Sequence, residues 1–231
     1  MFDLLTGIKE DVWLLYINIS NAFYNFFIYI LEVFKFYQNK VFRKIDFELL
    51  KIYSVNDQFQ VSISESRKIH LKRQNLTYGE TSLLAIDKIM KFIKPKESDI
   101  FYDLGCGTGR ICFFVNTFYK LNTNGIDLIP SFISNANKVI DKFKLENISI
   151  VKNNWLEMDL NDGDIFYIAG TCFSEEIINE LLEKLRTLKV GSIIISVSNN
   201  FEADYLKLIK SMTLPFSWGQ STVYILKVIE K

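Results

Sequence analysis

Residues 101–110 read FYDLGCGTGR, and this stretch decides the fold. Glycines stand at alternate positions, Gly105, Gly107 and Gly109, directly after a short apolar run that is typical of a buried strand. A glycine-rich loop between a parallel strand and a helix lets the backbone approach a ligand closely at the carboxyl end of the strand. A dinucleotide site requires its third glycine one position later, where this chain has Arg110. The loop therefore predicts a ligand site without a pyrophosphate.

Two carboxylates flank this loop. Asp103 lies two positions before the first glycine, where it can balance an ammonium or sulfonium charge. Asp127 ends the next strand, where a carboxylate can accept hydrogen bonds from both ribose hydroxyls and leave the base to lie on Leu128. An Asp at a strand end also caps helices, so Asp127 is informative only in combination with the loop. With Cys106 as a small spacer between glycines, the pattern suits a nucleoside joined to a zwitterionic amino acid.

Beyond residue 78 the chain alternates strand-like and helix-like segments. Short runs rich in β-branched and aromatic residues predict strands at 99–104, 123–128, 148–151, 164–170 and 192–198. Helical periodicity predicts helices at 81–93, 108–119, 131–143, 174–188 and 202–210. This alternation is typical of a doubly wound, mostly parallel sheet with helices on both faces. Residues 212–231 instead hold two strand-like runs around SWGQS, which predicts an antiparallel hairpin at the sheet edge.

The N-terminal third of the chain has a different composition. Residues 12–37 are rich in aliphatic and aromatic side chains, and the run is long enough to span a bilayer at about 20 residues. Asn18, Asn21 and Asn25 recur at helical spacing, so they form one polar stripe on an amphipathic helix. Three arrangements stay open for this helix: packed on the rest of the protein, lying on a membrane, or spanning one.

The opening of the chain lacks the basic region and the small-residue cleavage site of a secretory signal, so secretion is not expected. Basic residues follow the apolar run as far as Lys44 and would favour the cytoplasmic side if the helix inserted. A second amphipathic helix is predicted at 44–55. We expect a helical extension over residues 1–75 and a ligand-binding domain over residues 76–231. The predicted location is cytoplasmic, with membrane association through residues 12–37 as the open alternative.

Composition narrows the chemistry further. Lys plus Arg equals Asp plus Glu at 27 each, so nothing in the overall charge attracts nucleic acid, and no nucleic-acid partner is expected. Three cysteines without a Cys-x-x-Cys pair, together with one histidine, predict neither a disulfide framework nor a metal site. Thiols in a reducing compartment are expected instead. His70 lies among basic residues and is expected to be an exposed or capping histidine without a catalytic role.

The glycine loop and Asp127 together resemble the class I S-adenosylmethionine-dependent methyltransferases, and residues 77–110 sharpen the resemblance. A TYGET segment with Tyr78, Glu80 and Thr81 leads through a helix into the loop, as in the non-SET histone lysine methyltransferases, the disruptor-of-telomeric-silencing family. The chain is also similar to small bacterial methyltransferases of this branch, in which a GTC-like segment and a PFxWG hairpin appear. The resemblance implies a Rossmann-like α/β fold, a doubly wound, mostly parallel seven-stranded sheet with a reversed C-terminal hairpin, and S-adenosylmethionine as cofactor.

Two further motifs of the family match imperfectly. Where the family has an Asp and an aromatic that bind adenine, this chain has Asn154 and Trp155. Where it has an Asn near the transferred methyl group, this chain has Gly170 and Thr171, which puts a histone substrate in doubt. We expect Tyr78 and Thr171 to be catalytic and the TYGET segment to clamp the methionine end. The cofactor site predicted by the loop and the resemblance comprises Glu80, Thr81, Asp103, Gly105, Cys106, Gly107, Gly109, Asp127, Leu128, Asn154, Trp155 and Gly170.

Together these residues predict a methyltransferase that acts on a protein lysine. Methyl transfer from a sulfonium is an in-line displacement, so alignment is the main task of the protein, and burial beside that cation lowers the pKa of a lysine. The chain has no Asn-Pro-Pro-Tyr-type segment after its fourth predicted strand, and such a segment is typical of methylation at amide or base nitrogens. The alternatives are a small-molecule methyltransferase, a membrane-associated binding module with a vestigial cofactor site, and a nicotinamide oxidoreductase, which Arg110 disfavours.

Overall fold

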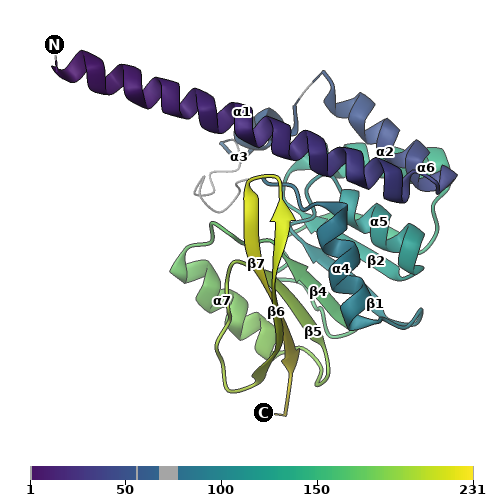
Figure 1. The fold of residues 1–231 in the computed structure, drawn as a ribbon. Helices are drawn as coiled ribbons and strands as arrows, with labels where there is room; N and C mark the ends of the chain where they lie inside the picture. Colours follow the sequence, from purple (N-terminus) through teal and green to yellow (C-terminus); the bar gives the residue numbers. More distant parts are fainter. Residues whose placement is uncertain (1, 56, 68–77, 231) are drawn as a thin grey trace.

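A computed structural model describes residues 2–55, 57–67 and 78–230. Its centre is a seven-stranded sheet in the order β3-β2-β1-β4-β5-β7-β6 (Figure 1). Strands β1 to β5 pair in parallel, whereas β7 pairs antiparallel with both β5 and β6. The doubly wound sheet with an antiparallel C-terminal hairpin is therefore confirmed. The strands are β1 Ile100–Leu104, β2 Asn122–Asp127, β3 Ile148–Lys152, β4 Ile165–Ile168, β5 Ile193–Val197, β6 Leu206–Phe216 and β7 Gly219–Val228.

Helices cover both faces of the sheet, because alternate side chains of its central strands point to opposite sides. In β4, Tyr167 joins an apolar cluster with α4 and α5, whereas Phe166 joins a second cluster with α7. A third cluster joins α6 to α5 and β3. The helices of this part of the chain are α4 Leu83–Ile93, α5 Arg110–Tyr119, α6 Pro130–Phe143 and α7 Glu175–Arg186.

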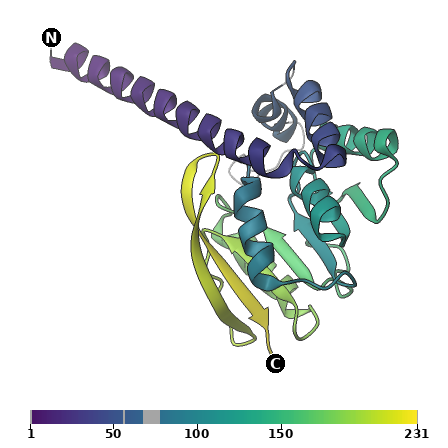
Figure 2. The ribbon, with the colours of Figure 1, turned by 45° about the vertical axis from the view of Figure 1, so that its right-hand side comes forward.

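The N-terminal extension consists of α1 Phe2–Phe36, α2 Lys40–Tyr53 and α3 Gln58–Ser66. Figures 1 and 2 show α1 as a long helix that crosses above the tip of the C-terminal hairpin and projects beyond the sheet at its N-terminal end. The C-terminal end of α1 is fixed by aromatic contacts, since the ring of Phe36 lies 4.8 Å from Phe114 and 5.5 Å from Phe118. Asn39 then caps α2 by accepting hydrogen bonds from two backbone N–H groups.

One predicted element is wrong. Residues 202–210 were expected to be helical, but the structure has the strand β6 from Leu206, paired with β7 and carrying a register shift between Leu208 and Lys210. The long strand β7 offers a free edge to this segment, and such non-local pairing overrides a short helical pattern. Lys207 and Lys210 are exposed on the resulting edge strand, where charged side chains discourage pairing with other chains.

The start of α4 also differs from the predicted start at residue 81. Ser82 caps the helix by accepting from the Ala85 N–H, and Thr81 pairs instead with Phe216 of the hairpin. Thr81 is thus held at the end of the sheet rather than in a helix. His70 and the predicted domain boundary at residues 75–76 lie outside the described residues.

Candidate active site

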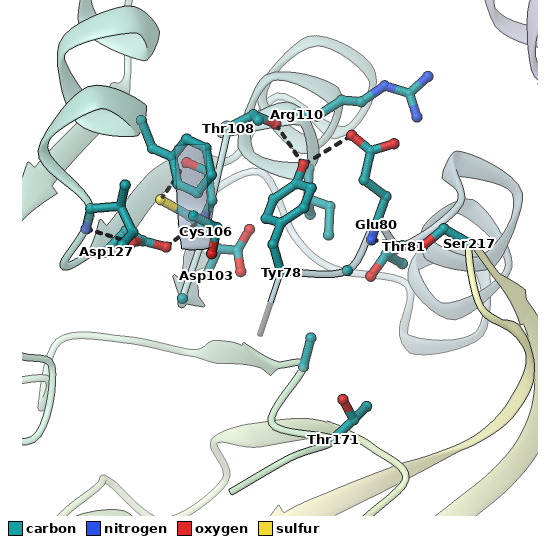
Figure 3. Close-up of a pocket in the computed structure, with 18 of the residues that line it drawn as sticks. Tyr78, Glu80, Thr81, Asp103, Cys106, Thr108, Arg110, Asp127, Thr171 and Ser217 are labelled. Atoms are coloured by element: carbon teal, nitrogen blue, oxygen red, sulfur yellow. Dashed lines mark hydrogen bonds between the residues drawn. The ribbon is translucent and has the colours of Figure 1, made fainter. Parts of the chain in front are cut away.

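A cavity of about 770 Å³ lies beyond the carboxyl ends of β1, β2 and β4 (Figure 3). This volume is in the range of sites for cofactor-sized ligands. The extension and the hairpin complete its walls. The predicted site residues that line it are Tyr78, Glu80, Thr81, Asp103, Gly105, Cys106, Gly107, Asp127 and Thr171.

The glycine loop forms the floor of the cavity. Gly105 has a φ of +94°, and a Cβ added there would meet nothing within 4 Å, so the missing side chain leaves space in the cavity. Gly107 has a φ of +51°, and a Cβ there would lie 2.7 Å from the ring of Tyr78. L-residues rarely adopt either conformation. The loop can therefore approach a ligand at Gly105 and pack directly beneath Tyr78 at Gly107.

Asp103 is a buried carboxyl at the end of β1. The Cys112 thiol donates to it at 3.7 Å, and no Lys or Arg within residues 2–55, 57–67 and 78–230 forms an ion pair with it. Burial raises the pKa of Asp103 from 3.8 to about 7. A cation bound in the cavity would supply the missing countercharge.

Asp127 joins the end of β2 to the glycine loop. Its carboxylate accepts hydrogen bonds from the Gly107 N–H and the Ile129 N–H, each at 2.8 Å. Burial raises the pKa of Asp127 although both N–H groups favour its charged form. A carboxylate has about four acceptor sites, so Asp127 retains capacity for ligand hydroxyls. Leu128 does not line the cavity, whereas Ile129 and Phe132 do; either can replace Leu128 as the apolar surface beside a base.

Tyr78 stands over the loop near the middle of the cavity (Figure 3). Its hydroxyl donates to Glu80 Oε1 at 2.9 Å and lies 3.4 Å from Thr108 Oγ1. Its ring packs against Phe59 of α3 and Phe132 of α6. Burial, with a further contribution from Glu80, raises the pKa of Tyr78 well above its usual value, so the phenol stays neutral.

The segment after Tyr78 is held by the hairpin and by β4. Glu80 exchanges two hydrogen bonds with Ser217, because its N–H donates to Ser217 Oγ and its carbonyl accepts from the Ser217 N–H. The hydroxyl of Thr81 is hydrogen bonded to that of Tyr167, a residue of β4 that the sequence did not single out. Gln58 of α3 donates to Glu80 at 3.4 Å. The TYGET segment is therefore positioned by three distant parts of the chain.

Several predicted site residues lie outside the cavity lining. Asn154 is hydrogen bonded to Glu157 on the surface. Trp155 is buried and stacks on Phe173, which does line the cavity, so Trp155 supports this wall from behind. A Cβ at Gly170 would lie 2.3 Å from the Phe173 ring. Gly170 is therefore a packing residue rather than a cavity-lining one.

Gly109 and Thr171 complete the predicted set. Gly109 caps α5, and a Cβ there would meet Ile150 at 2.7 Å, so this glycine faces the core. Thr171 lines the cavity across from Tyr78, as Figure 3 shows, and its hydroxyl lies 3.6 Å from the Cys172 sulfur.

Arg110 connects the site to the N-terminal extension through ion pairs that the sequence did not predict. Its guanidinium forms ion pairs with Asp46 at 2.7 Å and with Glu32 at 3.1 Å. Burial is the largest influence and acts to raise the pKa of Asp46, but the charge of Arg110 and the hydrogen bonds from Arg110 and Tyr37 together hold that pKa below its usual value. Burial raises the pKa of Glu32 despite the same cation. The available sequence signal for this network was an acidic residue within each apolar helix pattern, Glu32 in α1 and Asp46 in α2, because buried carboxylates require partners.

The described residues of the cavity fit a nucleoside joined to a charged amino acid. Asp103 is buried without an ionic partner and suits an ammonium group. Asp127 keeps acceptor capacity for ribose hydroxyls, and the side of Gly105 that lacks a Cβ leaves space for the ligand. These features match the demands of S-adenosylmethionine, which carries an ammonium group, a carboxylate, a sulfonium and an adenosine.

Comparison with known proteins agrees with this geometry. A family pattern described as a methyltransferase domain matches residues 95–215. A protein-lysine N-methyltransferase of Saccharolobus islandicus is 30% identical over 130 residues, which are 55% of this chain and 78% of that protein. A Dictyostelium discoideum histone-lysine N-methyltransferase, H3 lysine-79 specific, is 21% identical over 177 residues, 70% of this chain and 10% of that protein.

Solved structures agree on the fold. An RNA methyltransferase from Salinibacter ruber in complex with S-adenosyl-L-homocysteine superposes with a TM-score of 0.56 at 20% identity, over 65% of this chain and 94% of that one. The family match spans more than half of the chain, and it includes the glycine loop and Asp127. The chain therefore belongs to the class I S-adenosylmethionine-dependent methyltransferases.

Proposed function

We propose that this methyltransferase transfers methyl groups to lysine side chains of a protein. The observation that carries the proposal is the charge of the cavity. Glu80, Asp103 and Asp127 line it, whereas the cation among its lining residues, Arg110, is already paired with Glu32 and Asp46. With Asp103 assigned to the ammonium group of the cofactor, Glu80 and Asp127 are the carboxylates left to attract a cationic side chain and repel phosphate groups. The similarity to the protein-lysine N-methyltransferase of Saccharolobus islandicus supports the same acceptor.

The residues of the chain divide the work of binding and positioning. When bound, S-adenosylmethionine supplies a methyl group activated by a sulfonium. Asp103 would bind its ammonium group and Asp127 its ribose hydroxyls. Tyr78, anchored by Glu80 and Thr108, would form the wall against which an alkyl chain is aligned. Alignment of the two reacting groups is the main source of rate in such a displacement.

The acceptor amine must be neutral before it reacts. Exclusion of water by the aromatic rings around Tyr78 disfavours the charged form of a lysine and lowers its pKa, and a neighbouring sulfonium acts in the same direction. Tyr78 remains protonated because of its raised pKa. It therefore contributes position and a hydrogen bond and does not act as a phenolate base.

Acceptor class can be tested with S-adenosylmethionine that carries a tritiated methyl group. The full chain is incubated with a cell extract, and the labelled material is divided and treated with protease or ribonuclease. We expect protease-sensitive label that acid hydrolysis yields as methyllysine. Asp127→Ala should abolish the label, and Asp204→Ala, which alters an exposed Asp paired with Arg186, should not.

RNA is the acceptor that competes with lysine. A putative RNA methyltransferase of Acanthamoeba polyphaga mimivirus is 31% identical over 117 residues, 50% of this chain and 26% of that protein. Ribonuclease-sensitive label that disappears in Asp127→Ala would replace the lysine proposal with RNA methylation. Label on neither protein nor RNA would refute both.

A further inference from the structure

The side of α1 that faces away from the domain is an uncovered apolar surface. Phe23 and Phe34 expose 71% and 74% of their area, and the others on this surface expose between 39% and 68%. We name this surface the outer face of α1; its residues are Trp13, Leu15, Tyr16, Ile19, Phe23, Phe26, Phe27, Leu31 and Phe34. Soluble monomers seldom leave so continuous an apolar surface in water.

Helix geometry separates the outer face from the docked face. At 3.6 residues per turn the nine side chains fall within an arc of roughly 160°, and they extend over about 32 Å of helix. Asn25, Glu32 and Phe36 lie on the opposite side and contact the domain. One face of α1 is therefore docked on the domain, and the opposite face is apolar and uncovered.

The charge of α2, the helix that follows α1 in sequence, supports a choice of what covers the outer face. The chain as a whole has no net charge, but the exposed charged residues of α2 are all cations, Lys40, Arg43, Lys44 and Lys51. The half-buried Glu48 is paired with Lys142 at 2.6 Å. An aromatic-rich apolar face followed by a cluster of cations matches a bilayer interface that contains anionic headgroups.

The contacts of α1 also decide its orientation. Residues Leu15–Phe36 are long and apolar enough to cross a membrane by length and composition. However, Asn25 donates to the Ser217 carbonyl at 2.8 Å, Glu32 pairs with Arg110, and Lys35 pairs with Asp87 at 2.7 Å. A helix that spanned a bilayer over Leu15–Phe36 would lose the contacts of Asn25 and Glu32 with the domain and would bring the Glu32 carboxylate within the span.

We propose that α1 lies in the plane of a bilayer surface, with its outer face in the lipid and its docked face on the catalytic domain. Asn21 of the same helix lines the cofactor cavity. The cavity is then held within about one helix diameter, 10–12 Å, of the lipid. The proposal concerns membrane binding alone and holds whatever the methyl acceptor is.

Vesicle flotation with the full chain tests this arrangement. The chain is mixed with vesicles of phosphatidylcholine, with or without 30% phosphatidylglycerol, and centrifuged through a density gradient. We expect flotation with both vesicle types, several-fold stronger with phosphatidylglycerol and weaker at high salt. The double variant Phe23→Ser/Phe27→Ser should float at least tenfold less. Val190→Ser/Leu208→Ser removes exposed apolar side chains outside α1 and should float like the parent. Circular dichroism and cofactor binding are measured for both variants, to establish that each is folded.

Three results would overturn the proposal. The first is no flotation of the parent chain with either vesicle type. The second is a lipid-independent dimer in analytical ultracentrifugation that Phe23→Ser/Phe27→Ser dissociates, without flotation of the parent, because the outer face would then bind a second copy. The third is an N-terminal tag that resists external protease only while vesicles are intact, because α1 would then span the bilayer. None of these measurements depends on methyl transfer.

Discussion

At the scale of single residues, Asp103 makes cofactor binding depend on pH. The free protein holds this carboxyl with a pKa of about 7 because it is buried, and a bound ammonium group favours the charged form and lowers that pKa. Binding should therefore release a proton near neutral pH, and affinity should rise up to tenfold per unit towards pH 7 and then level off. Titration calorimetry in buffers of different ionisation enthalpy measures the released proton. Asp103→Asn should bind the cofactor more weakly and release no proton. If the variant releases as many protons as the parent, the proton comes from another group.

Gly105 allows the effect of the loop on binding to be separated from its effect on folding. Gly105→Ala would be strained by the φ of +94° and would direct a methyl group into the cavity. Gly191, with a φ of +97° and equally open surroundings, is a matched control outside the cavity. Both Ala variants should lose about 1–2 kcal/mol of unfolding free energy, measured in urea. Only Gly105→Ala should lose cofactor affinity; an equal loss in Gly191→Ala would contradict the placement of the cofactor.

The residue scale also shows where sequence reasoning succeeds. Asp103, Gly105, Gly107 and Asp127 line the cavity as expected, because spacing relative to a strand end determines which residues meet at the sheet edge. Their binding of the cofactor stays a prediction. Leu128 and Asn154 lie outside the cavity lining, because the direction of a loop side chain changes with a shift of one residue, which spacing does not determine. Tyr167 gave no signal, since an aromatic in a buried strand looks like any other core residue.

At the scale of elements, the ion pairs of α1 differ in their contribution to stability. Arg110→Met would leave Glu32 and Asp46 buried without a cation, so we expect a loss of about 3–5 kcal/mol. Lys35→Met removes a half-exposed cation from Asp87, which keeps Lys91 as partner, and should lose about 1 kcal/mol or less. Urea unfolding compares the two variants. Similar losses in both would show that the buried network does not secure α1.

Helices and strands were predictable where a local sequence pattern determines them. They were not predictable where contacts with residues distant in sequence determine them. Each of the five parallel strands was placed within about two residues, since a short run rich in β-branched and aromatic residues has a distinctive local composition. The first part of β6, from Leu206, was wrongly expected to be helical, because its pairing with β7 decides its state and no local pattern carries that information. The docking of α1 was open for the same reason, since its partners Arg110 and Ser217 are far away in sequence.

At the scale of the whole molecule, the carboxyl that prepares the site should make the free protein less stable at high pH. Folding raises the pKa of Asp103 from 3.8 to about 7. The protonated carboxyl therefore stabilises the fold fully below pH 3.8, and this stabilisation is lost as pH rises from 3.8 to about 7. Other groups whose pKa changes on folding, Glu32 and Asp46 among them, are present in both the parent and Asp103→Asn. The difference in stability between these two proteins therefore reports Asp103 alone. The loss should be on the order of 4 kcal/mol, with roughly 2–4 °C of Tm for each kcal/mol. Thermal unfolding from pH 5 to 8 should therefore show the Tm of Asp103→Asn rising relative to that of the parent as pH rises.

Saturating S-adenosylhomocysteine should reduce this difference in Tm at pH 8, because it binds the parent more tightly. A constant difference across this range would mean that Asp103 is already charged in the free protein, and the proton released on cofactor binding would then have to come from another group.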